Sequence, residues 1–427
     1  MKKKQFLIFF LCGFVGSALG IYIVKTLKTK QTEITSVPVQ KERTDKKVFV
    51  HMMTWFWTDE NNQHPEKEIK NNPWFGHWTM DKCNPETLIE HDPSAWKRQI
   101  ASHYYPLTGP YASRDKNIIE YQLLLMKLSG IDGIILNYTT LNKNWDFPAL
   151  IEATDSIAKL TQSVGLEIAI MYEDQHLRDN VGRGFLNDST AMLQAQSDMK
   201  YIKERYFSQP NYLKVNGKPV LLDFGPQYFT TEEQWTNVFS AFGEEQPAFY
   251  ALNYHGHRAG KNTAGEYAWI WKDYLDGLRH FNNTYEYAGD KMGVVYPGFV
   301  DFYKEGGWGD GMDWSIPHRG DTTFTETLQL ALSSTPNIIQ LATWNDYGEG
   351  TMIEPTYEFG YSFLTALQRE LGVKNLSQAD LELVFDFYQA RENNKGNVEA
   401  QKQLDKAFSL IAALRIDEAR KIINELK

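Results

Sequence analysis

Short apolar segments alternate along the chain with longer segments whose apolar residues recur every three to four positions. A short apolar run predicts a strand covered on both faces, and the longer period predicts an amphipathic helix. We expect eight strands, at residues 48–52, 133–136, 166–171, 219–222, 248–252, 267–270, 292–295 and 338–341. We expect helices between them at residues 118–129, 148–163, 191–206, 232–242 and 323–332.

This alternation predicts an α/β fold of the (β/α)8 TIM barrel type, in which helices surround a closed parallel sheet. A doubly wound open sheet is the alternative, because it has the same alternation. No Gly-rich turn of the dinucleotide or P-loop type follows any expected strand, and that weakens the alternative. We therefore prefer the barrel, at residues 47–375, and expect no cofactor.

The pattern after Glu358 is helical throughout. A segment at 361–371 would close the barrel, and residues 376–427 predict a small helical C-terminal extension. Its apolar spacing is similar to one tetratricopeptide hairpin, but a single unit is too short for a binding array. We interpret it as a cap on the barrel, with helices at 378–391, 398–413 and 416–426.

Residues 1–30 predict a signal peptide or a membrane anchor, and hence an exported protein. Lysines flank a mostly apolar run from Phe6 to Val24, which is long enough to span a bilayer. The small residues at 17–20 would also suit a signal peptidase, so anchoring and secretion both stay open. Cys12 invites a lipoprotein interpretation, but Leu11 is bulky where that cleavage needs a small residue.

Residues 31–46 are polar and charged, and predict a linker to a domain that begins near Val48. Beyond the N-terminal segment the chain has one cysteine, Cys83, which excludes an internal disulfide. The net charge of −10 makes nucleic acid an unexpected partner. An aromatic content of 14% favours carbohydrate, although many of these rings would serve the core. The sequence does not indicate the oligomeric state.

Polar and aromatic side chains follow the expected strands. In a barrel these strand ends meet on the face that carries catalysis, and a ring of such residues is hard to obtain from packing alone. A further loop, at 103–111, combines His and Tyr with Pro and Gly. The candidates for substrate contact are Trp55, His103, Tyr104, Tyr105, Tyr138, Glu173, Asp223, Tyr254, His255, Tyr296, Trp344 and Asn345.

Two carboxylates, Asp346 and Glu349, lie three residues apart directly after the last expected strand. Proximity of two carboxylates raises the proton affinity of one of them and leaves an acid and a base at neutral pH. Paired acids beside aromatic rings are typical of enzymes that break glycosidic bonds. The structural alternative is a helix cap and an ion pair, but Gly348 and Gly350 flank Glu349 as if the backbone made room.

His255 and His257 allow another hypothesis, a metal-dependent hydrolase with Asp223 or His51 as third ligand. Their spacing matches no well-defined zinc signature. We therefore expect no metal, and a chelator would test this.

The chain resembles the glycoside hydrolase family 71/99-like proteins over about residues 48–371. Family 99 enzymes are (β/α)8 barrels that cleave inside α-mannans or mannose-capped glycans, with two acids three residues apart after the last strand. The resemblance implies that Asp346 is the first acid and Glu349 the second, a general acid/base. It rests on residues 103–106, 109–111, 125–127, 130–133 and above all 344–355.

Two departures from family 99 bear on the mechanism. The first acid is Glu in the family and Asp346 here, and the residue before the second acid is His there and Gly348 here. In family 99 the first acid resembles a base toward the sugar 2-hydroxyl, whereas family 71 enzymes cut α-1,3-glucan, which requires an activated water. Both roles stay open for Asp346.

We expect a glycosidase, exported or membrane-anchored, that cleaves an α-linked polysaccharide or glycan of the mannan or glucan type, with endo action preferred. The alternative is a surface glycan-binding protein that keeps the barrel without turnover. Glu173 and the Tyr104-Tyr105 loop are expected to bind the carbohydrate in both cases.

Overall fold

The computed structural model describes residues 34–58, 76–87, 97–286 and 289–427. Residues 36–427 form one compact unit. In the described part of the chain, no helix is both long and apolar enough to cross a membrane. The expected signal or anchor at residues 1–30 lies outside the described residues.

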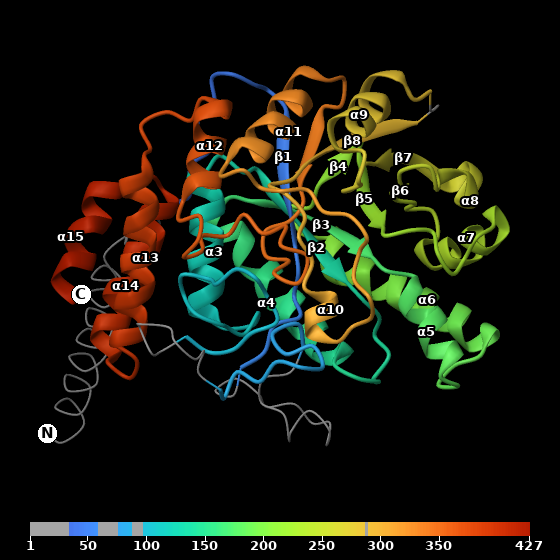
Figure 1. Ribbon diagram of the computed structural model, residues 1–427, viewed down its shortest axis with the longest axis horizontal. Helices are drawn as coiled ribbons and strands as arrows, with labels where there is room; N and C mark the ends of the chain where they lie inside the picture. Colours follow the sequence, from blue (N-terminus) through green and yellow to red (C-terminus); the bar gives the residue numbers. More distant parts are fainter. Residues whose placement is uncertain (1–33, 59–75, 88–96, 287–288) are drawn as a thin grey trace, which may run out of the picture. The chain divides into compact units, whose positions relative to one another are not determined.

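Eight parallel strands form a closed barrel, because the last strand pairs with the first and every other strand pairs with its neighbours (Figure 1). A two-residue strand, β4 (Lys214–Val215), pairs antiparallel with β5 outside this ring. The predicted TIM barrel is confirmed. Its strands are β1 (Lys47–Met52), β2 (Gly133–Tyr138), β3 (Glu167–Tyr172), β5 (Lys218–Asp223), β6 (Ala248–Leu252), β7 (Thr263–Tyr267), β8 (Asp290–Val295) and β9 (Ile338–Leu341).

One apolar cluster takes side chains from all eight barrel strands and fills the barrel. Successive side chains of a strand point to opposite faces, so alternate residues enter this core. Phe49 of β1, Ile135 of β2, Met171 of β3 and Tyr267 of β7 are such inward residues. The next inward position along each strand lies nearer the carboxyl end of the barrel, where the substrate face is expected.

The sixth barrel strand lies four residues earlier than we expected. We predicted it at 267–270, but β7 ends at Tyr267. The strand was missed because it contains a buried polar residue, Glu266. The Glu266 carboxylate accepts hydrogen bonds from the backbone N–H groups of Tyr254 (3.1 Å) and Gly256 (2.8 Å). Gly265 is also required, because a Cβ there would lie 2.4 Å from the Tyr250 ring.

The outer helices agree with the predicted segments, and some end in irregular turns. The 191–206 segment forms α6 (Asp188–Ile202) followed by a π-helical turn at Lys203–Phe207, and the 232–242 segment forms α7 (Glu232–Phe239) and a 3-10 turn at Ser240–Phe242. The remaining predicted barrel helices are α3 (Lys116–Leu128), α4 (Phe147–Val164), α11 (Thr322–Ser333) and α12 (Ser362–Leu371).

Three C-terminal helices follow the barrel, and they are the red helices in Figure 1: α13 (Gln378–Asn393), α14 (Val398–Ala412) and α15 (Ile416–Leu426). The first two pack beside α3, and α15 packs against α13 and α14. Arg391 of α13 is fully buried and joins the C-terminal helices to the barrel. Its guanidinium donates to Glu120 of α3 (3.0 Å) and to Asp405 of α14 (2.7 Å).

Residues 36–46 of the expected linker belong to the same compact unit and make specific contacts within it. Lys41 forms an ion pair with Asp132 at 2.5 Å, and its backbone bridges to Val373. The Lys127 ammonium donates to the carbonyl of Val37 at 2.7 Å. These contacts lie beside the amino ends of β1 and β2, at the opposite end of the strands from Asp346.

Candidate active site

The site is built from residues that continue the inward faces of the strands. Asn137 lies two positions after Ile135, and Glu173 lies two positions after Met171. Phe224 and Trp269 follow Leu222 and Tyr267 in the same way. All four line a hollow at the carboxyl ends of the strands, because the alternation of side chains carries them inward past the last core layer.

The two acids lie on a loop that the chain closes upon itself after β9. The N–H of Thr343 donates to the carbonyl of Thr351 (2.9 Å), and the N–H of Glu354 donates to that of Trp344 (2.9 Å). Gly350 has φ +65°, and a Cβ there would lie 2.7 Å from the Val300 carbonyl oxygen. Only glycine therefore fits this turn without strain.

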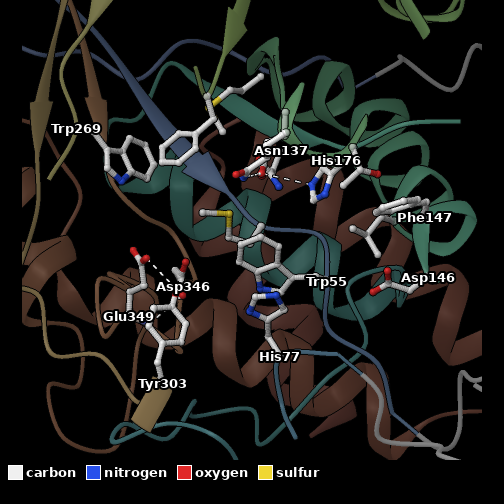
Figure 2. A pocket seen from close by; sticks show the side chains of 17 residues that line it. Trp55, His77, Asn137, Asp146, Phe147, His176, Trp269, Tyr303, Asp346 and Glu349 are labelled. Carbon is white, nitrogen blue, oxygen red and sulfur yellow. Dashed lines mark hydrogen bonds and ion pairs between the residues drawn. The ribbon is translucent and has the colours of Figure 1, made fainter. Parts of the chain in front are cut away.

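Asp346 and Glu349 interact directly within the loop. The backbone N–H of Glu349 donates to Oδ1 of Asp346 at 3.0 Å, and the Thr343 hydroxyl accepts from the N–H of Asp346 at 2.7 Å. The Tyr303 hydroxyl, from α10 (Tyr303–Gly306), donates to Oε1 of Glu349 at 2.9 Å. Figure 2 shows these three side chains together at one end of the hollow.

Burial changes the protonation of both acids. Burial raises the pKa of Asp346 to about 7, although the backbone N–H of Glu349 partly opposes this. Burial and the nearby charge of Asp346 raise the pKa of Glu349 to about 8, against the hydrogen bond from Tyr303. The pair therefore retains a proton near neutral pH, which general acid catalysis requires.

A cavity of about 290 Å³ extends from this pair, and we call it the polar hollow. Figure 2 shows Asp346 and Glu349 at one side of it, Asp146 and Phe147 at the other, and the Trp55 and His77 rings between them. Its lining includes Met53, Trp55, His77, Asn137, Thr139, Asp146, Phe147, Glu173, Gln175, His176, Phe224, Trp269, Tyr303, Asp346 and Glu349.

A pair of contacting side chains, Glu173 and His176, lies across the polar hollow from the acids. Nε2 of His176 lies 3.4 Å from Oε2 of Glu173, which also accepts from the Gln175 amide. Burial alone would raise the pKa of Glu173, but His176 and Gln175 outweigh it and lower the pKa to about 2. Glu173 is therefore an anion that can accept hydrogen bonds from sugar hydroxyl groups at all moderate pH values.

A second cavity, of about 410 Å³, adjoins the first, and we call it the aromatic hollow. It shares Phe224, Trp269 and Glu349 with the polar hollow. The aromatic rings that line this hollow suit the apolar faces of sugars. The other lining residues are Leu252, Asn253, Tyr254, His255, Ile270, Trp271, Phe299, Met312 and Trp314.

The structure distributes the predicted substrate contacts unevenly. Trp55 and Glu173 line the polar hollow, and Tyr254 and His255 line the aromatic hollow. Tyr296 lines a separate cavity of about 40 Å³ with Tyr254.

Tyr138 and Asp223 lie on the outward faces of their strands, one position after an inward residue. The Tyr138 ring packs against Tyr206, with the centroids 6.1 Å apart. Asp223 is fully buried and accepts from the N–H of Asp174 at 3.3 Å. Neither side chain lines one of the two hollows.

The 103–105 segment lies against the acid loop, outside both hollows. The Tyr104 hydroxyl is 3.2 Å from Nδ1 of His318, and a ring nitrogen of His103 is 3.2 Å from the Asp301 carbonyl oxygen. The Tyr105 hydroxyl accepts from the N–H of Arg98.

Trp344 and Asn345 are fully buried behind the acids. The N–H of Trp344 donates to the carbonyl of His51 at 2.7 Å. The Asn345 side chain accepts from the N–H of Met53 at 2.9 Å and donates to its carbonyl. Both residues therefore attach the acid loop to β1 and the segment after it.

Several lining residues were missed from the sequence. Trp269 was assigned to the interior of a strand, whereas it follows the end of β7. Tyr303 lies on a four-residue helix without a periodic pattern, and no sequence signal marks it. His176 lies three residues after Glu173, so the polar cluster after β3 was a signal that could have identified it.

The described residues contain no group of three or more His, Cys, Asp or Glu side chains arranged to hold a metal ion. His255 instead contacts the Asn253 carbonyl oxygen through Nδ1 at 2.9 Å. The ligand set suggested for a metal-dependent hydrolase is therefore not assembled in this part of the chain.

Comparisons with known proteins find relatives that are named as endo-α-mannosidases. A glycoprotein endo-α-1,2-mannosidase of Xenopus laevis is 24% identical over 369 residues, which cover 76% of this chain and 75% of that protein. The protein of the same name from Rattus norvegicus is 22% identical over 339 residues, or 72% of this chain and 67% of the relative. No family model matches the chain.

Solved structures share the fold. A GH99 endo-α-mannosidase from Bacteroides thetaiotaomicron has a TM-score of 0.50 at 17% identity and covers 80% of this chain and 98% of its own. A glycoside hydrolase-like protein has a TM-score of 0.51 at 12% identity, with 79% and 97% covered. The likeness to glycoside hydrolase family 99 and the barrel fold are thereby confirmed.

Proposed function

We propose that the chain is a glycoside hydrolase that cuts inside an α-linked, mannose-containing glycan. One observation carries the proposal: Asp346 and Glu349 form a proton-retaining acid pair where two hollows meet. The relatives named as endo-α-1,2-mannosidases support this choice of substrate. They do not favour the alternative of a glycan-binding protein without turnover.

The positions of the two acids suggest different roles. Glu349 lines both hollows, so it lies where a glycosidic oxygen would bridge a sugar in one hollow and a sugar in the other. Burial and the charge of Asp346 raise the pKa of Glu349, so a proton can stay on this carboxyl for transfer as the general acid. Of the two hollows, Asp346 lines only the polar one, beside the sugar that is attacked, and this position suits the base.

In this mechanism Glu349 transfers its proton to the glycosidic oxygen while the bond to the anomeric carbon breaks. Asp346 removes a proton either from the sugar 2-hydroxyl, which then attacks the anomeric carbon, or from a water that attacks it. The sugar that is attacked occupies the polar hollow, where Glu173 accepts hydrogen bonds from its hydroxyl groups. The leaving sugar occupies the aromatic hollow. Because both sides of the bond have a hollow, endo action is favoured.

Replacement of the proton donor tests this function. With α-1,2-linked manno-oligosaccharides as substrates, we expect the protein to release shorter oligosaccharides, and Glu349→Gln to lower kcat by roughly 10²- to 10⁴-fold. Glu305→Gln, at an exposed carboxylate of α10, is the control and should keep full activity. NMR of the first-formed anomer would show which role Asp346 takes. Full activity of Glu349→Gln would exclude the proposed role.

We also propose that residues 1–30 export the protein and either anchor it or are removed, and that residues 47–375 are the catalytic domain and 376–427 its helical extension. The apolar run between lysines supports export. The alternation of strands and helices ends with α12, before the C-terminal helices begin, and this supports the domain boundary. Recovery of the full chain in the cytosolic fraction of its own cells would contradict export.

A further inference from the structure

His77 forms part of the wall of the polar hollow, and its ring is held on two sides. It stacks on Trp55 with the centroids 3.8 Å apart and the planes 7° from parallel, and the Trp308 ring meets it edge-on at 4.8 Å. Its backbone N–H donates to the Trp55 carbonyl at 3.3 Å. The orientation of the imidazole is therefore fixed before any ligand enters.

Nδ1 of His77 is buried and has no hydrogen-bond partner among the described residues. A buried polar atom without a partner is costly, and such atoms in native proteins are found mainly where a ligand, a water or a functional role satisfies them. Burial also lowers the pKa of His77 to about 3, against the charge of Glu173. The neutral ring carries one donor nitrogen and one acceptor nitrogen.

The backbone leaves a gap between this nitrogen and the base. A Cβ at Gly348 would lie 3.5 Å from Oδ1 of Asp346 and 4.0 Å from Nδ1 of His77. The same Cβ would lie 2.9 Å from Cε of Met80, so the end of that flexible side chain would have to shift for a larger residue at position 348. Gly348 therefore places no side chain between the carboxylate and the imidazole, both of which face the polar hollow (Figure 2).

We propose that His77 is a substrate-binding residue whose Nδ1 forms a hydrogen bond with a hydroxyl group of the sugar held beside Asp346. The inference rests on the proposed glycosidase function and adds a contact from a segment that lies outside the barrel strands. The hydroxyl satisfies the unpaired nitrogen, and the stacked Trp55 ring keeps the imidazole from turning away. No bond is made or broken at His77.

Two substitutions separate the hydrogen bond from the packing. His77→Phe keeps a ring to stack on Trp55 but removes both nitrogens, whereas His77→Asn keeps a polar amide near the position of Nδ1 but loses the stacking. The measurement is calorimetric binding of an α-1,2-linked mannotetraose to the full chain carrying Glu349→Gln, which prevents turnover. We expect His77→Phe to weaken binding by roughly tenfold, the effect of one lost hydrogen bond, and His77→Asn to weaken it less.

His280→Phe, an exposed ring exchange outside both hollows, is the matched control and should not change the affinity. In the enzyme with Glu349 intact, His77→Phe should lower kcat/KM by the same factor at pH 5 and pH 8, because the ring is neutral at both. Unchanged binding by His77→Phe, or an equal or larger loss in His77→Asn, would overturn the inference alone. Absence of binding by the Glu349→Gln parent would overturn the proposed function, and the inference with it.

Discussion

Glu354 holds the acid loop in place although its side chain lies outside both hollows. The carboxylate is buried and accepts hydrogen bonds from the hydroxyl groups of Tyr111 (2.7 Å) and Tyr347 (3.0 Å) and from the Gln122 amide (2.7 Å). Burial raises its pKa to about 7, although these donors oppose the change. Tyr347 directly follows Asp346, so this network controls where the base lies.

Glu354→Gln should therefore lower both stability and turnover. The amide presents a donor to groups that also donate, so at least one hydrogen bond is lost, and the free energy of unfolding should fall by about 1–3 kcal/mol. We expect kcat to fall with little change in KM, because the acid loop shifts while the sugar contacts of Glu173 remain. Denaturant unfolding and steady-state kinetics measure the two effects.

Tyr347→Phe removes one of the three donors and should show a smaller effect of the same kind. An unchanged kcat in Glu354→Gln, with stability reduced, would restrict Glu354 to folding. A kcat that falls together with a shifted pH profile would support control of the acid pair.

At the scale of elements, α13 is attached to the barrel by a buried charge. Arg391 and Glu120 are almost fully buried, and Arg391 has further contacts with Gln401 and Asp405. Loss of one partner of a buried pair typically costs about 3–5 kcal/mol. Glu120 would keep the exposed Lys116 ammonium, 3.2 Å away, as a partner, so Arg391→Ala should lower the free energy of unfolding by about 3 kcal/mol, the lower end of that range.

Chemical denaturation followed by circular dichroism measures this change. Arg415→Ala removes an ion pair to Glu418 that is about half exposed on both sides, and should change the stability much less, because solvent screens this pair. We expect both variants to keep kcat while they remain folded, since α13 and α15 line neither hollow. If both substitutions lowered the free energy of unfolding by the same amount, the buried ion pair of Arg391 would contribute no more than an exposed one.

The elements that could be predicted from the sequence are those whose buried positions are occupied by apolar residues. β9 was expected at 338–341 and lies there, because all four residues are buried and only Gln340 is polar. β7 was displaced because a buried glutamate and a glycine form its centre. Periodicity reports average burial, and it does not register a polar residue that is satisfied by backbone N–H groups.

Individual site residues were less predictable than strands, for a geometric reason. The place of Asp346 and Glu349 beside the polar hollow was predictable, because the strand before them and their spacing are local in sequence. Side chains near the end of a strand alternate between the hollow and the outer helices, so a shift of one position changes which residue faces the hollow. Asn137 lines the hollow, whereas its neighbour Tyr138 packs against Tyr206. The contact between Tyr303 and Glu349 joins two loops, and no local pattern encodes it.

At the scale of the whole molecule, the site should make stability fall as the pH rises. The folded pKa values of Asp346, Glu349 and Glu354, about 7, 8 and 7, all exceed the ordinary values of such groups. At these three groups the folded state therefore binds more protons than the unfolded state between about pH 4 and pH 8, so their contribution to the free energy of unfolding declines with pH. His77, with its pKa lowered to about 3, has the opposite effect below about pH 6.5. Each such group contributes a slope of up to about 1.4 kcal/mol per pH unit while it titrates in only one state.

Removal of the titrating acid should remove its share of this decline. At pH 5 Glu349 is protonated in the folded protein, so Glu349→Gln should change the melting temperature little. At pH 8 the folded protein bears the cost of a buried, partly ionised pair, so the same substitution should raise the melting temperature above that of the unaltered protein. Thermal unfolding at both pH values measures this, with Glu305→Gln as the exposed control. A variant that is destabilised equally at pH 5 and pH 8 would mean that the two acids are not held against their preferred charge, and that the acid pair lacks the proton on which the proposed mechanism depends.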